Sequence, residues 1–453
     1  MNIIIVGCGK IGTALAMYLS KENHNITVID KSRRALENVV NSYDAVGYEG
    51  NGASASLLKK ADIQNADLLI AMTGNDELNV MCCLVARKIG HCRTIARVTN
   101  PDYQNELGIL KEELGLALVV NPDSMVAGEI ARLIRKPFVN RIDVFAGGRA
   151  ELLTYRLDGD HKWNGMRIID LARSVNMRFL ICAIERNNEV IIPNGDFILQ
   201  ENDLISCLVA GNNEDRFSHE LRMKRHKVTN CMIAGGGDIA FYLAKNLQKR
   251  RLGVTIIEKS ESRSEFLSNE LDDVLIINED VINTDILEEE GIKKADAFVA
   301  LTNTDDTNIL LAMYAASHSN AKCIYKQNRR LYGDITKGLN LGSVVSTPEI
   351  VSDNIISYVR AMNATKGNNI ETLYKILDSR AEALEFIIND DMPHLGQPLS
   401  QLHIRDGILI ACIIRGGTVE IPNGSSVVKK GDRVIVVTTK TGLHDISNIF
   451  VGV

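Results

Sequence analysis

The chain has 453 residues, which suggests roughly three or four domains, and its apolar fraction of 45% is that of a globular protein with sizeable cores. The net charge of −6 gives no reason to expect a nucleic-acid partner, and no apolar stretch approaches the length of a membrane-spanning helix. The chain starts directly with a strand-like run and not with a signal peptide, so we expect a cytoplasmic protein. Its nine cysteines are scattered without a CxxC pair, which predicts small buried residues and neither a metal site nor disulfides.

A glycine-rich turn near the N-terminus is the most informative motif. The apolar run Ile3–Val6 is typical of a strand buried on both faces, and a helical stretch, Thr13–Ser20, and a second apolar run, Ile26–Ile29, come later. Between the first strand and the helix stand the residues Gly7, Cys8, Gly9, Lys10, Ile11 and Gly12, and Asp30 follows the second strand. Strand, glycine turn, helix, strand and acid form the order of a dinucleotide-binding unit.

Each residue of the turn has a physical role in this interpretation. Gly7 allows the tight turn, Gly9 lets the backbone approach a pyrophosphate, and Gly12 lets the helix lie against the strand. The open N–H groups at the start of the helix would then face the phosphates. Asp30 can accept hydrogen bonds from both ribose hydroxyls and would repel a 2′-phosphate, which favours NAD over NADP. The alternative is a Rossmann-like domain that binds no nucleotide.

The same pattern occurs a second time. Strand-like residues Cys231–Ala234 precede a turn, and Val254–Ile257 end on Glu258. The second turn consists of Gly235, Gly236, Gly237, Asp238, Ile239 and Ala240. Both Gly7 to Gly235 and Asp30 to Glu258 are shifts of 228 residues, so the copies align without a gap. Because Ala240 replaces the third glycine and Glu258 is longer than aspartate, the alternative of a non-binding domain is stronger here.

The segment after Asp30 alternates strands with helices. The expected helices are 31–43, 53–61, 77–89 and 122–136, and the expected strands are 45–48, 67–72, 93–98 and 116–120. This alternation predicts a doubly wound parallel sheet, in which ligands bind beyond the carboxyl ends of the strands. Besides the turn and Asp30, those ends carry Asn51, Thr73, Gly74 and Arg97, and Arg97 is a candidate counter-charge for the pyrophosphate or else an ordinary surface arginine.

The next segment has short strand-like runs and turns. Ile181–Ile184, Val190–Ile192 and Leu204–Val209 are the expected strands, with a helix at Ile168–Ala172. They predict a small α+β unit that is too small for a catalytic cleft of its own. The basic run Arg222–Lys227 then reads as a solvated linker.

The second half repeats this plan. Thr302 matches Thr73, Lys326 matches Arg97, and Val419–Gly424 matches Val190–Gly195, each at a shift of 229. The fold class is therefore α/β, with two doubly wound Rossmann-like parallel-sheet domains, each followed by a small α+β domain, in a tandem duplication. We expect the Rossmann-like domains at residues 1–137 and 228–365 and the small domains at 138–221 and 366–453. Lysine cannot clamp a diphosphate with two parallel hydrogen bonds as arginine can, so the two sites should differ.

The ordered set of motifs resembles the TrkA family of Trk-type potassium-uptake proteins, which are built of RCK domains (regulator of potassium conductance, also called KTN-type). The resemblance covers essentially the whole chain and rests on GCGKIG, TVID, GNGAS, ADLLIAMTGNDELN, IARV, IPNGD and, in the second copy, IPNGS. It implies a regulatory subunit that binds NAD(H), with ATP or ADP as other possible nucleotides. It also implies a homo-oligomer, a dimer or a tetramer ring, attached peripherally to the inner face of the cell membrane beneath a potassium-translocating subunit.

The resemblance also implies two sets of binding residues. The first site would use Gly7–Gly12, Asp30, Asn51, Thr73, Gly74 and Arg97. The second would use Gly235, Gly237, Asp238, Ile239, Glu258, Thr302 and Lys326, but its departures from the family pattern, Ala240, Lys326 and the residues 278–280 near the place of Gly50–Gly52, put its NAD binding in doubt.

An NAD-dependent oxidoreductase is the alternative function. It would need a general acid or base beside the nicotinamide and a substrate domain. The histidines are scattered, no Ser/Tyr/Lys, Cys/His or His/Asp arrangement stands out, and the small domains are duplicated. A P-loop NTPase is excluded because no GxxxxGK[ST] occurs. The sequence therefore favours a regulatory, non-enzymatic nucleotide sensor.

Overall fold

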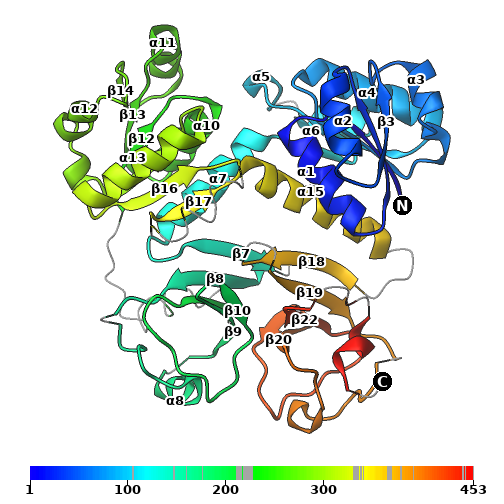
Figure 1. Cartoon of the computed structure of the whole chain (residues 1–453), viewed down its shortest axis with the longest axis vertical. Helices are drawn as coiled ribbons and strands as arrows, with labels where there is room; N and C mark the ends of the chain where they lie inside the picture. The colour runs from blue at the N-terminus through cyan, green and yellow to red at the C-terminus, as the bar shows by residue number, and fades with distance from the viewer. Residues whose placement is uncertain are drawn as a thin grey trace. The chain divides into compact units, whose positions relative to one another are not determined.

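The structure is a computed structural model, and Figure 1 shows it coloured from the N-terminus to the C-terminus. It describes residues 1–104, 107–145, 148–159, 161–175, 177–210, 217, 228–329, 336, 339, 341–364, 370–377, 380–390, 392–440, 443 and 445–451. The basic run Arg222–Lys227 lies outside the described residues. The chain forms two compact units, one of residues 1–131 with 229–356 and the other of residues 132–228 with 357–453.

A six-stranded parallel sheet forms the first part of the first unit. Its strands lie in the order β3-β2-β1-β4-β5-β6, which is the order of a doubly wound dinucleotide-binding sheet. The strands are β1 (Asn2–Val6), β2 (Asn25–Asp30), β3 (Ala45–Glu49), β4 (Leu68–Ala71), β5 (Arg93–Arg97) and β6 (Leu118–Val120). The helices are α1 (Lys10–Lys21), α2 (Arg33–Val40), α3 (Ala55–Lys60), α4 (Asp76–Gly90), α5 (Pro101–Gln104), α6 (Leu107–Glu113) and α7 (Pro122–Arg135).

The same sheet occurs again in the second half of the chain. Its strand order β14-β13-β12-β15-β16-β17 reproduces the first, and every neighbouring pair is parallel. The strands are β12 (Asn230–Ala234), β13 (Gly253–Ile257), β14 (Val274–Ile277), β15 (Ala297–Ala300), β16 (Lys322–Lys326) and β17 (Ser343–Val345). The helices are α10 (Asp238–Gln248), α11 (Glu261–Glu270), α12 (Thr284–Glu289), α13 (Asp305–His318) and α15 (Thr347–Ala364). The predicted pair of doubly wound parallel sheets is therefore confirmed.

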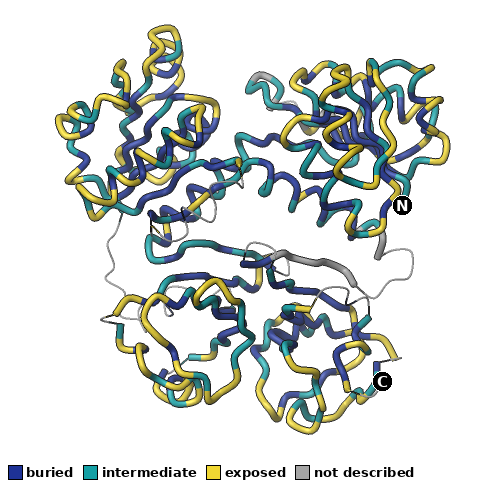
Figure 2. Tube along the Cα trace, viewed as in Figure 1, coloured by how far each residue is buried: buried dark blue, intermediate teal, exposed yellow. Residues whose placement is uncertain are grey.

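The central strands are apolar because helices cover both faces of the sheet. Ile3, Ile4 and Ile5 of β1 are all buried, as expected for a parallel sheet of this kind. Figure 2 shows the central strands of the first sheet in dark blue, whereas many exposed residues lie on the helices and loops. The two sheets of this unit also contact one another through Tyr242, whose hydroxyl donates to the carbonyl of Thr99 at 3.1 Å and accepts from the Asn121 amide at 3.3 Å.

The second unit holds two five-stranded antiparallel sheets. Their orders are β10-β9-β11-β8-β7 and β18-β19-β22-β20-β21. The strands are β7 (Arg141–Phe145), β8 (Ala150–Arg156), β9 (Phe179–Arg186), β10 (Glu189–Ile191), β11 (Leu204–Ala210), β18 (Ile370–Ile376), β19 (Ala381–Ile387), β20 (Ile408–Arg415), β21 (Thr418–Glu420) and β22 (Arg433–Thr438). Helix α8 (Ile168–Ser174) belongs to the first small domain. The sequence predicted β9, β10, β11 and α8 but missed β7 and β8.

The two small sheets share one apolar core. Leu152, Cys182 and Leu208 from the first sheet pack in the same buried cluster as Ala381 and Ala411 from the second. All nine cysteines are buried, as predicted, and each is a free thiol. The compact units divide inside α7 and α15, so the four-domain boundaries expected from the sequence stay a prediction. Among the described residues, no helix is both long enough and apolar enough to cross a bilayer.

An ion pair between an arginine and a buried aspartate recurs at the same place in both small domains. Asp203 is buried, and its two carboxylate oxygens accept from Nε and Nη2 of Arg186, both at 2.7 Å. Asp432 makes the same two contacts with Arg415, at 2.8 and 2.7 Å. Asp203 also accepts the backbone N–H of Gln200, and Asp432 accepts that of Lys429. This bidentate pair therefore anchors the loop that joins β10 to β11 and its counterpart in the second half.

Replacing Asp203 by alanine should destabilise the small domains. It leaves Nε of Arg186 and the Gln200 N–H without their acceptor, and losing hydrogen bonds to a charged group costs about 1.5–3 kcal/mol. Asp390→Ala is the matched control, because its pair with Lys430 is exposed and should contribute little. The measurement is thermal unfolding followed by circular dichroism. An Asp203→Ala variant that melts at the same temperature as Asp390→Ala would contradict the expectation.

Candidate functional site

The glycine turn after β1 brings the backbone and helix α1 into close contact. Gly7 has φ +100°, a conformation that favours glycine. A Cβ on Gly12 would lie 1.8 Å from the Gly7 carbonyl oxygen, so only glycine permits this approach of helix to turn. A Cβ on Gly9, by contrast, would meet nothing within 4 Å. The space beside Gly9 is therefore open, whereas Gly7 and Gly12 are required by the protein's own packing.

Helix α1 begins with unused hydrogen-bond donors. Gly9 is its N-cap residue and provides no side-chain cap, and the first turn carries no acidic residue. The N–H groups and the positive end of the helix dipole thus stay available to an anion. These features are what a pyrophosphate requires at this point of the fold.

Asp30 ends β2 beside the turn. One carboxylate oxygen accepts the Cys8 N–H at 2.6 Å, and the other accepts the Ser32 N–H at 2.7 Å. These bonds fix the position of the carboxylate, and each oxygen retains a lone pair for a further donor. The predicted role of Asp30 toward ribose hydroxyls is thus compatible with its position.

Thr73 and Arg97 are held together by a buried asparagine. Asn79 accepts from the Thr73 N–H at 2.9 Å and from its hydroxyl at 2.7 Å, and it donates to the carbonyl of Arg97 at 3.0 Å. The Arg97 guanidinium donates through Nη1 to the Thr73 carbonyl at 3.2 Å, while its Nε is buried and has no hydrogen-bond partner among the described residues. A buried donor without a partner is costly, and an anionic ligand would supply the missing acceptor.

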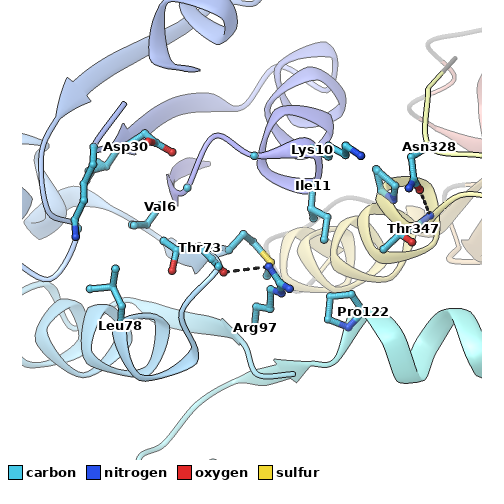
Figure 3. Close-up of a pocket in the computed structure, with 18 of the residues that line it drawn as sticks. Val6, Lys10, Ile11, Asp30, Thr73, Leu78, Arg97, Pro122, Asn328 and Thr347 are labelled. Carbon is cyan, nitrogen blue, oxygen red and sulfur yellow. Dashed lines mark hydrogen bonds between the residues drawn. The ribbon is translucent and has the colours of Figure 1, made fainter. Parts of the chain in front are cut away.

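A cavity of about 580 Å³ lies along these residues (Figure 3). From the first half, it is lined by Val6, Gly7, Gly9, Lys10, Ile11, Ile29, Asp30, Lys31, Gly50, Gly52, Met72, Thr73, Gly74, Leu78, Arg97, Pro122 and Asp123. From the second half, it is lined by Ile239, Lys326, Asn328, Thr347 and Pro348. Figure 3 shows Asp30 near one end of the cavity and Asn328 and Thr347 near the other. The size is within the range usual for small-molecule sites.

Most of the first predicted set meets in this cavity. Three members are not among its lining residues: Cys8, Gly12 and Asn51. The Cys8 side chain is buried, and its backbone N–H bonds to Asp30. Gly12 packs against the turn. Asn51 lies between two glycines that line the cavity, and its side-chain oxygen accepts the Ala53 N–H. Of the second predicted set, Ile239 and Lys326 line the cavity, and Gly235, Gly237, Asp238, Glu258 and Thr302 do not.

The sequence prediction missed the far end of the cavity. Asp123 follows β6, Asn328 follows β16, and Thr347 follows β17. Each is therefore just beyond the carboxyl end of a parallel strand, the position that had identified Asp30 and Arg97. The same rule, applied to these three strands, could have found them as candidates. That the two halves share one cavity could not be deduced in this way.

Two opposite charges in the cavity have shifted pKa values. Burial raises the pKa of Asp123, an effect reinforced by Asp238 and opposed by Arg97 and Lys326. Burial lowers the pKa of Lys326, an effect opposed by Asp123 and Asp305. For both side chains the loss of hydration is the largest cause, so partial burial outweighs their attraction for one another.

The second glycine turn has a different environment. The Glu258 carboxylate accepts the Gly236 and Ser260 N–H groups at 2.7 and 2.8 Å, as Asp30 does in the first half. Arg263, however, donates to the Gly236 carbonyl at 2.7 Å and to the carboxylate of Asp238 at 2.8 Å. The corresponding residues of the first half are Ala35 and Lys10, each 228 positions earlier. The second turn therefore carries an ion pair and an acidic residue beside its helix terminus, and the first turn has neither.

Fold and site define a class of nucleotide-binding proteins with paired doubly wound sheets. The TrkA-N domain description matches residues 3–122 and 231–347, and the TrkA-C domain description matches residues 152–221 and 383–451. The chain therefore belongs to the TrkA family, in agreement with the resemblance seen in the sequence.

Relatives match along nearly the whole chain. A Trk system potassium uptake protein TrkA homolog of Archaeoglobus fulgidus is 30% identical over 450 residues, covering 99% of this chain and all of the relative. The Trk system potassium uptake protein TrkA of Halomonas elongata is 30% identical over 459 residues, covering 99% of this chain and 98% of the relative. Among solved structures, the GsuK channel bound to NAD has a TM-score of 0.61 and 18% identity, covering 97% of this chain and 77% of that one. At this identity the likeness shows the fold alone.

Proposed function

We propose that the chain is a regulatory, nucleotide-sensing subunit of a Trk-type potassium uptake system, and that it binds NAD(H) in the cavity beside the first glycine turn. The observation that carries this proposal is the open N-terminus of α1 facing a cavity that holds Asp30 at one end and the incompletely paired Arg97 guanidinium along its wall. These groups match a ribose and a pyrophosphate. The names of the relatives support the link to potassium uptake.

Other adenine nucleotides share part of this chemistry. ATP and ADP carry the same ribose and diphosphate, so they are candidate competitors for the first site. The residues expected to hold any of these ligands are Gly7–Gly12, Asp30, Thr73, Gly74 and Arg97, with Asn51 beside them. When bound, the nucleotide supplies charge and hydrogen-bonding groups and takes part in no reaction.

The proposed mechanism is a shift between two arrangements of the protein. The cavity is lined from both halves of the first compact unit, so a ligand that fills its whole length contacts both. Such a ligand stabilises whichever arrangement of the halves it binds more tightly, and only this difference in affinity can change the populations. In a homo-oligomeric ring, a dimer or a tetramer, the change would reach a potassium-translocating membrane subunit. The chain would be cytoplasmic and peripherally attached to the inner face of the membrane.

An NAD-dependent oxidoreductase is the second candidate, and one observation favours it. Asp123 and Lys326 line the cavity, and their pKa values are shifted toward each other, as is common for acid–base groups in active sites. We rank this function lower because burial of two opposite charges produces the same shifts without catalysis. Steady consumption of NADH with any substrate in a broad panel would reverse the ranking.

Substituting Gly9 by valine should abolish NADH binding. A side chain at Gly9 would occupy the open space that the pyrophosphate needs, and nothing in the protein lies within 4 Å of its Cβ position. We expect the dissociation constant for NADH to rise roughly a hundredfold or more, measured by isothermal titration calorimetry. NADPH should bind the wild-type protein more weakly than NADH, because its 2′-phosphate would face the Asp30 carboxylate.

The melting temperature of Gly9→Val provides the control. It should equal that of the wild type, because the substitution removes no contact within the protein. Unchanged NADH affinity in a folded Gly9→Val variant would place the ligand elsewhere and refute the assignment of the site.

Potassium uptake is tested in cells. A strain that lacks this chain should need a higher external potassium concentration for growth, and a plasmid-borne wild-type copy should restore growth. Growth rates over a series of potassium concentrations measure the effect. Equal growth of the deletion strain and its parent at every concentration, with no parallel uptake system present, would contradict the transport function.

A further inference from the structure

The first inference concerns the end of the cavity that lies away from Asp30. Lys326, Asn328 and Thr347 line the cavity, and all three belong to the second half of the chain. Figure 3 places Asn328 and Thr347 at the end away from Asp30. Asn328 lies in the loop after β16, and Thr347 is the first residue of α15, which follows β17. The two are joined because the Asn328 side-chain oxygen accepts the Thr347 N–H at 3.1 Å. We name Lys326, Asn328 and Thr347 the distal wall; Figure 3 labels Asn328 and Thr347.

A dinucleotide is long enough to need two recognition regions, one for each nucleoside. Asp30 is placed for the ribose next to the adenine, and the N-terminus of α1 is placed for the phosphates. The distal wall lies beyond that helix terminus and offers neutral polar groups, the Asn328 amide and the Thr347 hydroxyl, together with one lysine. Amide and hydroxyl groups suit a ribose and a carboxamide, which are neutral and can both donate and accept hydrogen bonds.

We propose that the distal wall binds the nicotinamide nucleoside of NAD(H), so that the second half of the chain recognises the part of the ligand that ADP lacks. This inference rests on the proposed function of the first site. It makes Asn328 a specificity-determining residue, although it is about 320 positions away from the glycine turn in the sequence. The bound dinucleotide then bridges the two halves, whereas ADP occupies the first half alone.

Comparing NADH with ADP tests this assignment. Asn328→Ala should weaken NADH binding about fivefold to tenfold, the effect of losing one hydrogen bond, and should leave ADP binding unchanged. Asn269→Ala is the matched control, because Asn269 is an exposed residue of α11 outside the cavity. Both affinities are measured by isothermal titration calorimetry on the full chain.

The outcomes distinguish a failure of this inference from a failure of the proposed function. If NADH and ADP are weakened equally, or if neither is weakened, the distal wall does not recognise the nicotinamide nucleoside and the inference is wrong. If the wild type binds neither NADH nor ADP, the proposed function itself fails. An affinity loss for NADH alone supports the inference.

The second inference starts from a different observation, the ion pair over the second glycine turn. The Arg263 guanidinium bonds to both the Gly236 carbonyl and the Asp238 carboxylate, and it stacks on the ring of Phe266 at 4.7 Å. The Asp238 carboxylate stands in the first turn of α10, where a second pyrophosphate would have to bind. A carboxylate at that position, even when paired with Arg263, gives phosphates no donor, whereas the first half has the cation Lys10 there.

Two residues predicted to bind a nucleotide at the second turn belong to the first cavity instead. Ile239 and Lys326, which a nucleotide on the second turn was expected to contact, line the cavity of the first half. We infer that the second turn is closed by the Arg263–Asp238 pair and that each chain binds one NADH. The second half thus serves the first site instead of holding a site of its own.

Stoichiometry measured with paired glycine variants tests the closure. A Cβ on Gly237, like one on Gly9, would meet nothing within 4 Å, so the two variants carry the same steric change. Titration of the wild type should give one NADH per chain, Gly237→Val should leave this unchanged, and Gly9→Val should remove all binding. Two NADH per chain, or a loss of binding in Gly237→Val, would overturn the inference.

A further variant tests the role of the ion pair itself. In the Gly9→Val background, Arg263→Ala combined with Asp238→Lys gives these two positions the residues of the first half, alanine and lysine. NADH binding should return in this triple variant. Continued absence of binding in the folded protein would show that some other feature closes the turn, and the assignment to Arg263 and Asp238 would be wrong.

Discussion

The contact between Gly12 and the Gly7 carbonyl is the constraint on which the site depends. Because no Cβ separates them, α1 starts directly beside the turn that follows β1, and its first N–H groups point toward the carboxyl edge of the sheet. The other site residues are placed relative to this edge. Asp30 is tied to the turn through the Cys8 N–H, and Asn79 ties Thr73 to Arg97 on the neighbouring strands. The cavity is thus formed by strand ends that a parallel sheet brings together.

The duplicated halves keep the same framework but differ in their polar groups. Asn308 holds Thr302 and the carbonyl of Lys326 with the same bonds that Asn79 makes in the first half. Ala240 stands where Gly12 stands, so the helix cannot approach the turn as closely in the second half. Asp238 stands at the position of Lys10, and Arg263 stands at the position of Ala35. The Asp238 and Arg263 side chains pair with each other. A few substitutions suffice to change the electrostatic character of the turn without a change of fold.

Sequence reasoning identified the parts whose signals are local. The glycine turns, Asp30, Glu258 and the strands of both parallel sheets follow from short patterns and from the spacing of 228 residues. The strands β7 and β8 were missed because runs such as Arg141–Phe145 mix charged and apolar residues, which is usual for antiparallel sheets with one exposed face. Asn328 and Thr347 were missed because their meeting with the first turn depends on how the two parallel sheets pack, and no periodicity encodes that. The burial that shifts the pKa values of Asp123 and Lys326 arises from the same packing.

The shared apolar core of the small sheets has a consequence for the duplication itself. A protein made of one repeat alone would leave Leu152, Cys182 and Leu208 without the cover that Ala381 and Ala411 provide. Such a half-length chain would have to find a second molecule, and its folding would depend on protein concentration. Covalent linkage replaces that search by a high effective concentration of the second repeat. In a dimer of identical chains every mutation occurs in both copies. In the linked chain a mutation changes one repeat only, so the two repeats can acquire different residues.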